Sequence, residues 1–220
     1  MMFSSKFNFS NIKKITVQTL HDGFFKLVRL SYDSPRYQGG RSQVVGHEVL
    51  LRPEAVVVLG YDVHKDQVVL IEQLRSGLVA CGAQAPWLTE VVAGLCEDNE
   101  PVHTTAVREL EEETGLSTEV LIPIASYWVS PGGTSEKVHA FCALVDSEQA
   151  GEYGGLANEG EDIKIKMVSR QDLLAGLYAR ELNNSATVLC AQWLALHFAD
   201  IKKKIESKES VNEWIYIRRP

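Results

Sequence analysis

The sequence predicts an α/β (α+β) fold that carries a small N-terminal unit of β-strands. The 220 residues are 45% hydrophobic and 23% charged, the composition of a folded chain long enough for one ample domain with an appendage. Short runs of β-branched residues recur along the chain and indicate strands. Other segments repeat apolar residues about every 3.6 positions, which indicates helices. This mixture of strands with a few helices favours a mixed fold.

The N-terminal region alternates β-branched and polar residues. Residues 13–32 do so on both sides of the turn-like His21-Asp22-Gly23, which predicts a hairpin. The polar stretch over residues 34–42 interrupts the pattern and indicates a loop or a boundary. We therefore place an N-terminal β unit over residues 1–50.

Residues 51–200 are predicted to form the main domain. Its β-rich runs lie at residues 55–59, 67–71, 90–93, 120–129, 137–145 and 163–168. Helical spacing is present at residues 102–116, where Gly115 is a natural C-terminal stop. Two further helical segments are expected at residues 170–178 and 185–198.

A C-terminal tail is expected over residues 201–220. Residues 202–210 are polar and charged, which indicates a fraying helix or a linker. Trp214–Ile217 fit a short strand or an apolar end. A partly ordered terminus and a partner-binding one both remain open for this tail.

The bulk composition excludes several classes of function. The formal net charge of −7 disfavours a nucleic-acid binder, because phosphate backbones are held mainly by Lys and Arg. No apolar run approaches the roughly 18 residues of a membrane span, and the N-terminus lacks the apolar region of a signal peptide. A cytoplasmic protein without a nucleic-acid or membrane partner is therefore expected. The cysteines lack zinc-site spacing and are expected to be reduced core residues: Cys81, Cys96, Cys142 and Cys190.

Carboxylates are unusually dense in the helix expected at residues 102–116. Glu109, Glu112 and Glu113 stand at positions i, i+3 and i+4, so they project from one face with Cβ atoms roughly 5–6 Å apart. Three like charges repel one another there, and a bound divalent cation reverses that effect. Oxygen ligands suit Mg²⁺ or Mn²⁺ rather than zinc. A solvated acidic face is the alternative for such a Glu run taken alone.

The residues before the helix belong to the same pattern. Because Gly94 has no Cβ, the backbone can approach a metal or the helix closely, and the carbonyl of Ala93 is then a candidate ligand. Glu100 and Arg108 follow at fixed spacing. The whole stretch over residues 94–116 resembles a complete Nudix box, without a mismatch.

This resemblance implies a fold and a chemistry. Nudix proteins carry the box as a loop-helix-loop on an α/β/α sandwich, and they hydrolyse nucleoside diphosphates linked to a further moiety. By resemblance, Glu109 and Glu113 are the principal metal ligands and Glu112 is a supporting ligand. The resemblance also implies that the Ala93 carbonyl is a metal ligand. Four further residues of the motif have structural roles by the same resemblance: Gly94, Glu100, Arg108 and Gly115.

Other segments resemble bacterial ADP-ribose pyrophosphatases over about residues 15–198. These segments are residues 23–25, 71–75, 90–94, 130–136 and 155–163. The likeness implies hydrolysis of ADP-ribose to AMP and ribose 5-phosphate. It also implies a homodimer in which the N-terminal unit is exchanged and the adenine pocket is shared.

The same likeness implies a set of substrate contacts. Arg75 would hold a phosphate, and Phe24 and Phe25 would stack near the adenine, although plain packing explains the two rings equally well. The other implied contacts are Leu95 and, in the loop at residues 130–136, Ser130, Gly132 and Glu136.

The chain departs from these relatives at His47-Glu48, where they carry an Arg-Glu pair. A cationic substrate contact at His47 is then lost or depends on pH. Arg52 is the candidate to replace it. The departure keeps another nucleoside diphosphate sugar, such as ADP-glucose or GDP-mannose, open as the substrate. A non-catalytic ADP-ribose sensor is a weaker alternative, because such sensors usually lose carboxylates of the box and this chain has lost none.

Hydrolysis also needs a base to deprotonate the attacking water. Carboxylates that hold a metal are poor bases, so the base has to come from elsewhere. The Gly-rich loop at residues 154–161 offers two carboxylates, and loops of this kind commonly close over substrate. By resemblance, Glu159 is the base and Glu161 is a further metal ligand, with Glu161 as the alternative base.

Overall fold

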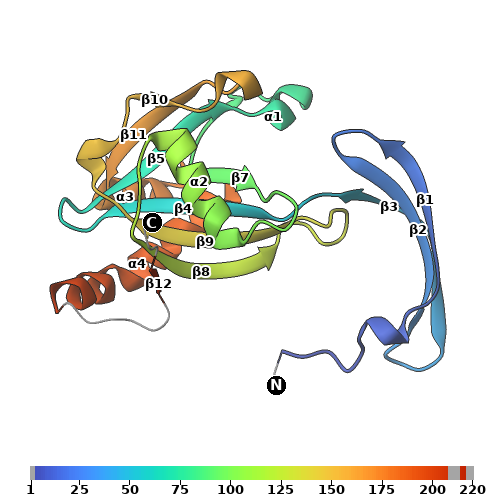
Figure 1. Cartoon of the computed structure of the whole chain (residues 1–220). Coiled ribbons are helices and arrows are strands. Elements are labelled where there is room, and N and C mark those ends of the chain that lie inside the picture. Colours follow the sequence, from blue (N-terminus) through green and yellow to red (C-terminus); the bar gives the residue numbers. More distant parts are fainter. Residues whose placement is uncertain (1–2, 208–213, 217–220) are drawn as a thin grey trace. The chain divides into compact units, whose positions relative to one another are not determined.

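The computed structural model describes residues 3–207 and 214–216, which fall into two compact units (Figure 1). The small unit comprises Met1–Pro53 together with Trp128–Lys137. The large unit comprises Glu54–Tyr127 and Val138–Pro220. The loop expected within the main domain at residues 130–136 therefore belongs to the small unit.

The small unit is a three-stranded antiparallel sheet in the order β1-β2-β3. A 3-10 turn, η1 (Phe9–Asn11), precedes β1 (Lys13–Asp22), β2 (Lys26–Pro35) and β3 (Arg41–Leu51). The hairpin expected at residues 13–32 is present. The loop expected at residues 34–42 is wrong in extent, because β2 runs to Pro35 and β3 begins at Arg41. β3 was missed because Gly46, at φ +73°, interrupts its alternation.

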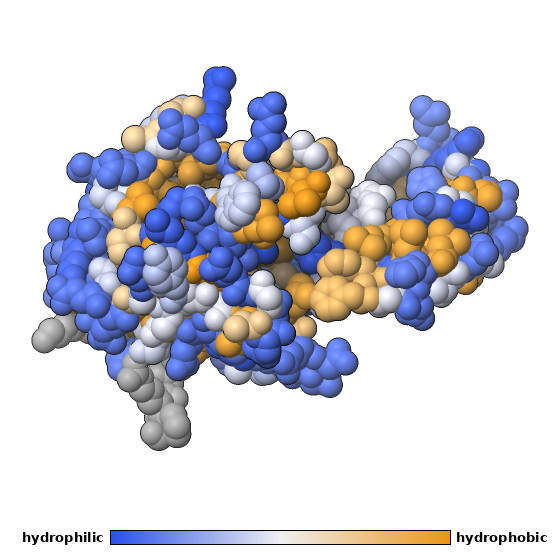
Figure 2. Space-filling model, turned by 90° about the horizontal axis from the view of Figure 1, so that it is seen from above, coloured by the Kyte–Doolittle hydropathy of each residue, from blue (hydrophilic) through white to orange (hydrophobic). Residues whose placement is uncertain are grey.

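The surface of the small unit is rich in apolar side chains. Among its described residues Val28 is the buried hydrophobic one, because a sheet of this size has little core. In Figure 2, apolar side chains lie among polar ones on the surface of this unit. The exposed apolar residues of this unit include Ile15, Val17, Phe24, Tyr37, Val45 and Leu51.

The large unit is built on a mixed sheet in the order β10-β11-β5-β4-β9-β8-β12. β4 and β9 run parallel to each other, and the other pairings with a recorded register are antiparallel. β6 pairs with β5, and β7 pairs with β4. The strands are β4 (Ala55–Asp62), β5 (Gln67–Leu74), β6 (Trp87–Glu90), β7 (Val92–Leu95), β8 (Val120–Trp128), β9 (Lys137–Leu144), β10 (Tyr153–Gly154), β11 (Ile163–Ser169) and β12 (Ile215–Tyr216).

Helices cover both faces of this sheet. α2 (Val102–Thr114) packs on one face through Ala106 and Leu110, where alternate residues of β4 meet it. α3 (Arg170–Ala179) and α4 (Ser185–Glu206) pack on the other face, against the intervening residues of β4. The expected α/β/α sandwich is therefore confirmed. The remaining elements are α1 (Ser76–Ala80), η2 (Ser147–Gln149) and η3 (Ala157–Glu159).

Several boundaries differ from the sequence-based expectation. The single strand expected at residues 90–93 is two strands, because the chain changes partner from β5 to β4 at Val91. α4 continues to Glu206 instead of ending near residue 198. In the tail, Ile215 pairs with Leu121 of β8, whereas residues 208–213 and 217–220 lie outside the described part.

Two observations bear on the environment of the chain. No described helix is long and apolar enough to cross a membrane. All four cysteines are free: Cys142 and Cys190 are buried and Cys96 is half-buried, but Cys81 is exposed. The expectation that the cysteines are core residues is therefore wrong for Cys81, which lies just after α1.

Candidate active site

The α2 helix presents its carboxylates next to its apolar contacts, because Glu113 follows Leu110 by three positions and is itself buried. It begins after Pro101 and ends at Gly115, whose φ of 72° is the left-handed conformation that glycine adopts most readily. Ala106 and Leu110 are fully buried against the sheet. The helical period then directs the glutamates toward the strand β7 and the loops around it.

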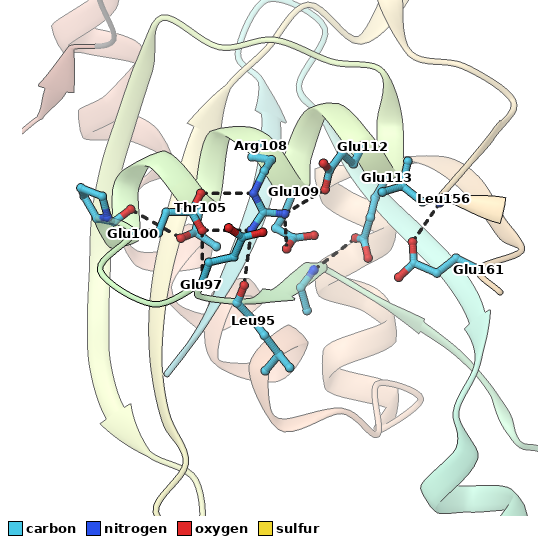
Figure 3. A network of polar contacts seen from close by, with 12 residues as sticks. Leu95, Glu97, Glu100, Thr105, Arg108, Glu109, Glu112, Glu113, Leu156 and Glu161 are labelled. Carbon is cyan, nitrogen blue, oxygen red and sulfur yellow. Dashed lines mark hydrogen bonds and ion pairs between the residues drawn. The ribbon is translucent and has the colours of Figure 1, made fainter. Parts of the chain in front are cut away.

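Arg108 is the hub of the carboxylate cluster (Figure 3). Its Nε and Nη2 donate to the two carboxylate oxygens of Glu100, at 3.2 and 3.1 Å. Its Nη1 donates to Glu109 at 2.8 Å and to Glu112 at 2.9 Å, and Nη2 also reaches the carbonyl oxygen of Leu95 at 3.3 Å. The hydrogen bonds from Arg108 lower the pKa of Glu100 to about 2. Arg108 therefore ties the loop before α2 to the helix.

Glu113 is buried and Glu109 is largely buried, and both carboxylates have raised pKa values. Glu113 is 1% exposed, and its Oε2 accepts the Ala93 N–H at 3.2 Å. Burial raises the pKa of Glu113 to about 8 and that of Glu109 to about 7, where Arg108 partly offsets the burial. The negative charge of Glu109 also raises the pKa of Glu113. Both groups are therefore costly to ionise without a further positive charge nearby.

The donor set fits a hard divalent cation. The carboxylates that gather here offer oxygen atoms, the ligands that Mg²⁺ and Mn²⁺ prefer. Gly94 leaves room for them, because a Cβ at this position would lie 1.9 Å from Cδ of Glu109. Within the described residues, no three His, Cys, Asp or Glu side chains are already gathered as a metal cage. Glu109 and Glu112 instead bind Arg108.

Replacing Gly94 with alanine is expected to displace Glu109 while leaving the fold intact. The added Cβ meets the far end of a flexible side chain, so Glu109 moves and the backbone does not have to. We expect kcat/KM to fall on the order of 100-fold, since misplacing a reacting group by about 1 Å has this effect. The Mg²⁺ concentration for half-maximal activity should rise.

Gly77→Ala is the matched control for this substitution. A Cβ at Gly77 meets nothing within 4 Å, so any general effect of a Gly-to-Ala change appears there too. Activity measured over a Mg²⁺ titration compares the two variants. A normal Mg²⁺ requirement in Gly94→Ala would show that the Glu109 position does not matter for metal binding.

The metal-free chain is expected to lose stability as the pH rises from about 5 to about 8. Because the folded pKa of Glu113 is about 8, the folded chain keeps a proton that the unfolded chain has released above its ordinary pKa. The proton that Glu113 keeps in the folded chain lowers the unfolding free energy by up to about 1.4 kcal/mol per pH unit, the value for one proton. Glu113→Gln abolishes the titration. The unfolding free energy of Glu113→Gln minus that of the parent chain should therefore increase as the pH rises.

Urea unfolding in EDTA at several pH values measures this difference. Glu111→Gln, at an exposed position of the same helix, is the control and should give a difference that does not change with pH. Parallel pH profiles for Glu113→Gln and the parent chain would show that Glu113 is not a strained buried carboxylate.

The Gly-rich loop at residues 154–161, which begins at the end of β10, is anchored to the end of α2. The Gly155 N–H donates to the carbonyl oxygen of Glu112 at 3.1 Å. A Cβ on Gly154 would lie 2.0 Å from the carbonyl oxygen of Glu113, so only glycine permits this approach. Gly154 was not predicted as a site residue, although the Gly154-Gly155 pair is a visible signal in the sequence.

The two candidate carboxylates of this loop differ in their surroundings. Glu161 accepts the Leu156 N–H at 3.1 Å and lies beside Glu113 in Figure 3. Its charge raises the pKa of both Glu109 and Glu113. Glu159 ends η3 and is exposed. The structure thus brings Glu161, and not Glu159, next to the carboxylates of α2.

Arg75 follows β5 and contacts Glu90, which was not predicted as a site residue. Its Nε donates to Oε1 of Glu90 at 2.6 Å. The positive charge of Arg75 lowers the pKa of Glu113, so the guanidinium is close enough to influence the carboxylate cluster. No local signal marked Glu90, because it reads as one polar residue within a β-rich run.

The remaining candidates belong to the small unit, where four of them lie together. The Phe24 and Phe25 rings meet edge to face, with centroids 4.7 Å apart. The Arg52 guanidinium lies over the Phe25 ring at 4.5 Å and pairs with Glu136 at 3.3 Å. Within this unit the structure therefore joins an aromatic pair to a charged pair. Phe24 is 84% exposed, which a simple core role does not explain.

Three further candidates of the small unit are exposed. His47 lies on β3 opposite Leu30, and its neighbour Glu48 pairs with Arg29 at 2.9 Å. Ser130 begins a turn in which its carbonyl oxygen accepts the N–H groups of Gly133 and Thr134. Gly132 has open space around it. None of these three is buried, so all are accessible to a ligand.

The comparisons with known proteins agree with this geometry. Residues 51–191 match the family model described as the NUDIX domain. The chain is 38% identical over 199 residues to an ADP-ribose pyrophosphatase of Haemophilus influenzae, covering 90% of this chain and 92% of the relative. It is 33% identical over 188 residues to a GDP-mannose pyrophosphatase of Citrobacter koseri, covering 83% and 95%. A solved ADP compounds hydrolase shares the fold, with a TM-score of 0.60 and 22% identity over 84% of this chain and 96% of that one.

Proposed function

The chain belongs to the NUDIX family, and we propose that it hydrolyses the pyrophosphate bond of ADP-ribose to AMP and ribose 5-phosphate. The observation that carries this proposal is the similarity to an ADP-ribose pyrophosphatase along 90% of the chain, in both units. The carboxylate set of α2 is also complete, as a metal-dependent hydrolase of this family requires. An enzyme that cleaves a phosphoric anhydride is thereby favoured over a binding module.

Residues of α2 and β7 would hold the metal, for which we propose Mg²⁺, with Mn²⁺ as a substitute. Glu109 and Glu113 are the principal ligands, Glu112 and Glu161 are supporting ligands, and the carbonyl of Ala93 completes the set. A divalent cation held there offsets the negative charge of the pyrophosphate. Arg108 keeps Glu109 and Glu112 on the same side of the helix, and it stays charged in all conditions used for activity.

The remaining steps fall to side chains outside the helix. Arg75 binds a phosphate oxygen of the substrate. Glu159 takes the proton of the attacking water, and its exposed position on the loop lets it move when the loop closes. The water oxygen bonds to one phosphorus, the bridging P–O bond breaks, and the two monophosphates leave as AMP and ribose 5-phosphate.

We propose that the enzyme acts as a homodimer. The three-stranded sheet of the small unit exposes several large apolar side chains, as surfaces that bind another protein chain do. Phe24, Phe25 and Arg52 would then contribute to a shared adenine site. The free cysteines agree with a reducing compartment such as the cytoplasm, which we include in the proposal.

A nucleoside diphosphate sugar is the second candidate substrate. The similarity to a GDP-mannose pyrophosphatase favours it, as does the exposed His47 at a position where an arginine is expected. The two substrates share the pyrophosphate and differ at the base and the sugar. Their choice therefore depends on residues outside the box.

A substrate panel tests the proposed function. With Mg²⁺ present, phosphate-coupled turnover of ADP-ribose should exceed that of ADP-glucose, GDP-mannose, a diadenosine polyphosphate and NADH. Light scattering after size-exclusion chromatography gives the oligomeric state of the same sample. Greatest activity on a nucleoside triphosphate would overturn the substrate assignment, and an active monomer would overturn the shared site.

A further inference from the structure

Glu90 is a buried carboxylate that the proposed chemistry does not use. It ends β6, is 2% exposed, and engages both of its oxygens with side chains. Oε1 accepts the Arg75 Nε–H at 2.6 Å, and Oε2 accepts the Asn184 amide at 2.8 Å. Burying a charge is costly unless it is paired and hydrogen-bonded, so this carboxylate needs Arg75 beside it. The same contact fixes the position of Arg75.

The contact leaves most of the guanidinium free for a ligand. An arginine has five N–H donors in a rigid planar fork, and Glu90 takes the one at Nε. Within the described part of the chain, Glu90 is the one ion-pair partner of Arg75. The side chain of Arg75 is 37% exposed, so its two terminal nitrogens can be reached from solvent. That geometry suits bidentate binding of a phosphate.

Asn184 holds the other side of Glu90 and connects it to the long helix α4. Its Oδ1 accepts the N–H groups of Ala186 and Thr187, which caps the first turn of α4. Thr187 in turn accepts the Val91 N–H through its hydroxyl oxygen at 3.1 Å. One carboxylate oxygen of Glu90 is therefore bound by the N-cap residue of α4, and the other is bound by Arg75.

We propose that Glu90 is a positioning residue that holds Arg75 in the orientation that binds a phosphate of the nucleoside diphosphate. This inference rests on the proposed function, because it assigns Arg75 to the substrate of that same site. Glu90 acts through Arg75 and does not touch the substrate. Its loss should therefore weaken substrate binding through Arg75 and leave the metal requirement unchanged.

A double-mutant cycle with Glu90→Gln and Arg75→Ala tests the proposal. Glu90→Gln should raise the KM for ADP-ribose about tenfold, as expected for one misplaced charge-assisted contact, with kcat within about twofold of the parent. In the Arg75→Ala background the same substitution should have no further effect on KM. The Mg²⁺ concentration for half-maximal activity should stay the same in both variants.

Two further variants separate positioning from a general effect on the fold. Asn184→Ser keeps a good N-cap for α4 but removes the amide donor to Glu90, so a smaller rise in KM is expected, again only when Arg75 is present. Glu72→Gln is the matched control, because Glu72 pairs with Lys166 and lies on the strand next to β6. It should leave KM unchanged. If Glu90→Gln folds poorly, Asn184→Ser carries the same test.

The outcomes distinguish this inference from the proposed function. If the parent enzyme does not hydrolyse ADP-ribose, the proposed function fails, and the cycle is run on whichever substrate of the panel is hydrolysed fastest. If Glu90→Gln raises KM by the same factor with and without Arg75, or lowers kcat alone, Glu90 does not act through Arg75 and the inference is overturned.

Discussion

Glu113→Gln is expected to lower kcat/KM for ADP-ribose on the order of 100- to 1,000-fold, the range for losing much of a metal ion's contribution to a reaction. Glu113 is the most buried carboxylate of α2, and its carboxylate oxygen already accepts the Ala93 N–H. A neutral amide of the same shape keeps that hydrogen bond but lacks the charge that a cation requires. Metal binding and activity should therefore fall together.

Kinetics over a Mg²⁺ titration measure both quantities in one experiment. The half-saturating Mg²⁺ concentration should rise at least tenfold in Glu113→Gln, and high Mg²⁺ should restore part of the activity. Glu111→Gln, exposed on the same helix, should behave like the parent chain. A loss of kcat without any change in the Mg²⁺ requirement would contradict the assignment of Glu113 as a ligand.

Glu159→Gln is expected to lower kcat on the order of 100- to 10,000-fold, the usual contribution of a general base. KM for ADP-ribose should change little, because Glu159 is exposed on the loop and is proposed to act on the water and not to bind the substrate. Loss of the base also predicts that the acidic limb of the pH profile of kcat disappears. Steady-state kinetics at several pH values measure both effects.

Glu161→Gln is the matched variant for this test. Glu161 lies beside Glu113 and raises its pKa, so its loss should increase the Mg²⁺ requirement more than it lowers kcat at saturating Mg²⁺. The two glutamates are two positions apart, yet they should give opposite patterns. Near-normal turnover in Glu159→Gln would remove this residue as the base and pass the role to Glu161.

The fold class and the box helix could be predicted because both depend on local patterns. Apolar residues recur at the helical period in α2, and Gly115 ends the helix with the left-handed conformation expected of it. The boundary at residues 90–93 could not be predicted. Two short strands meet at Val91, and their separation depends on which distant strand each one pairs with. β3 was missed because Gly46 breaks its alternation.

The substrate contacts were harder to place than the carboxylates of the box. Arg52 and Phe25 are 27 positions apart in the sequence. Only the folding of the small unit brings them into contact. Glu159 and Glu161 looked equivalent in the sequence. The structure separates them, because a turn at Gly160 directs one toward α2 and leaves the other exposed.

The chemistry of this protein can be inferred from the sequence, because spacing along a single helix decides which carboxylates share a face. Glu109, Glu112 and Glu113 share one face in any structure in which that helix forms. The hydrogen-bond partners of these carboxylates and of Arg75, in contrast, depend on how distant segments fold together. Glu90 is 15 positions from Arg75, and Asn184 is 94 positions from Glu90. Contacts over such separations follow from strand pairing and core packing, and a local sequence pattern does not predict them.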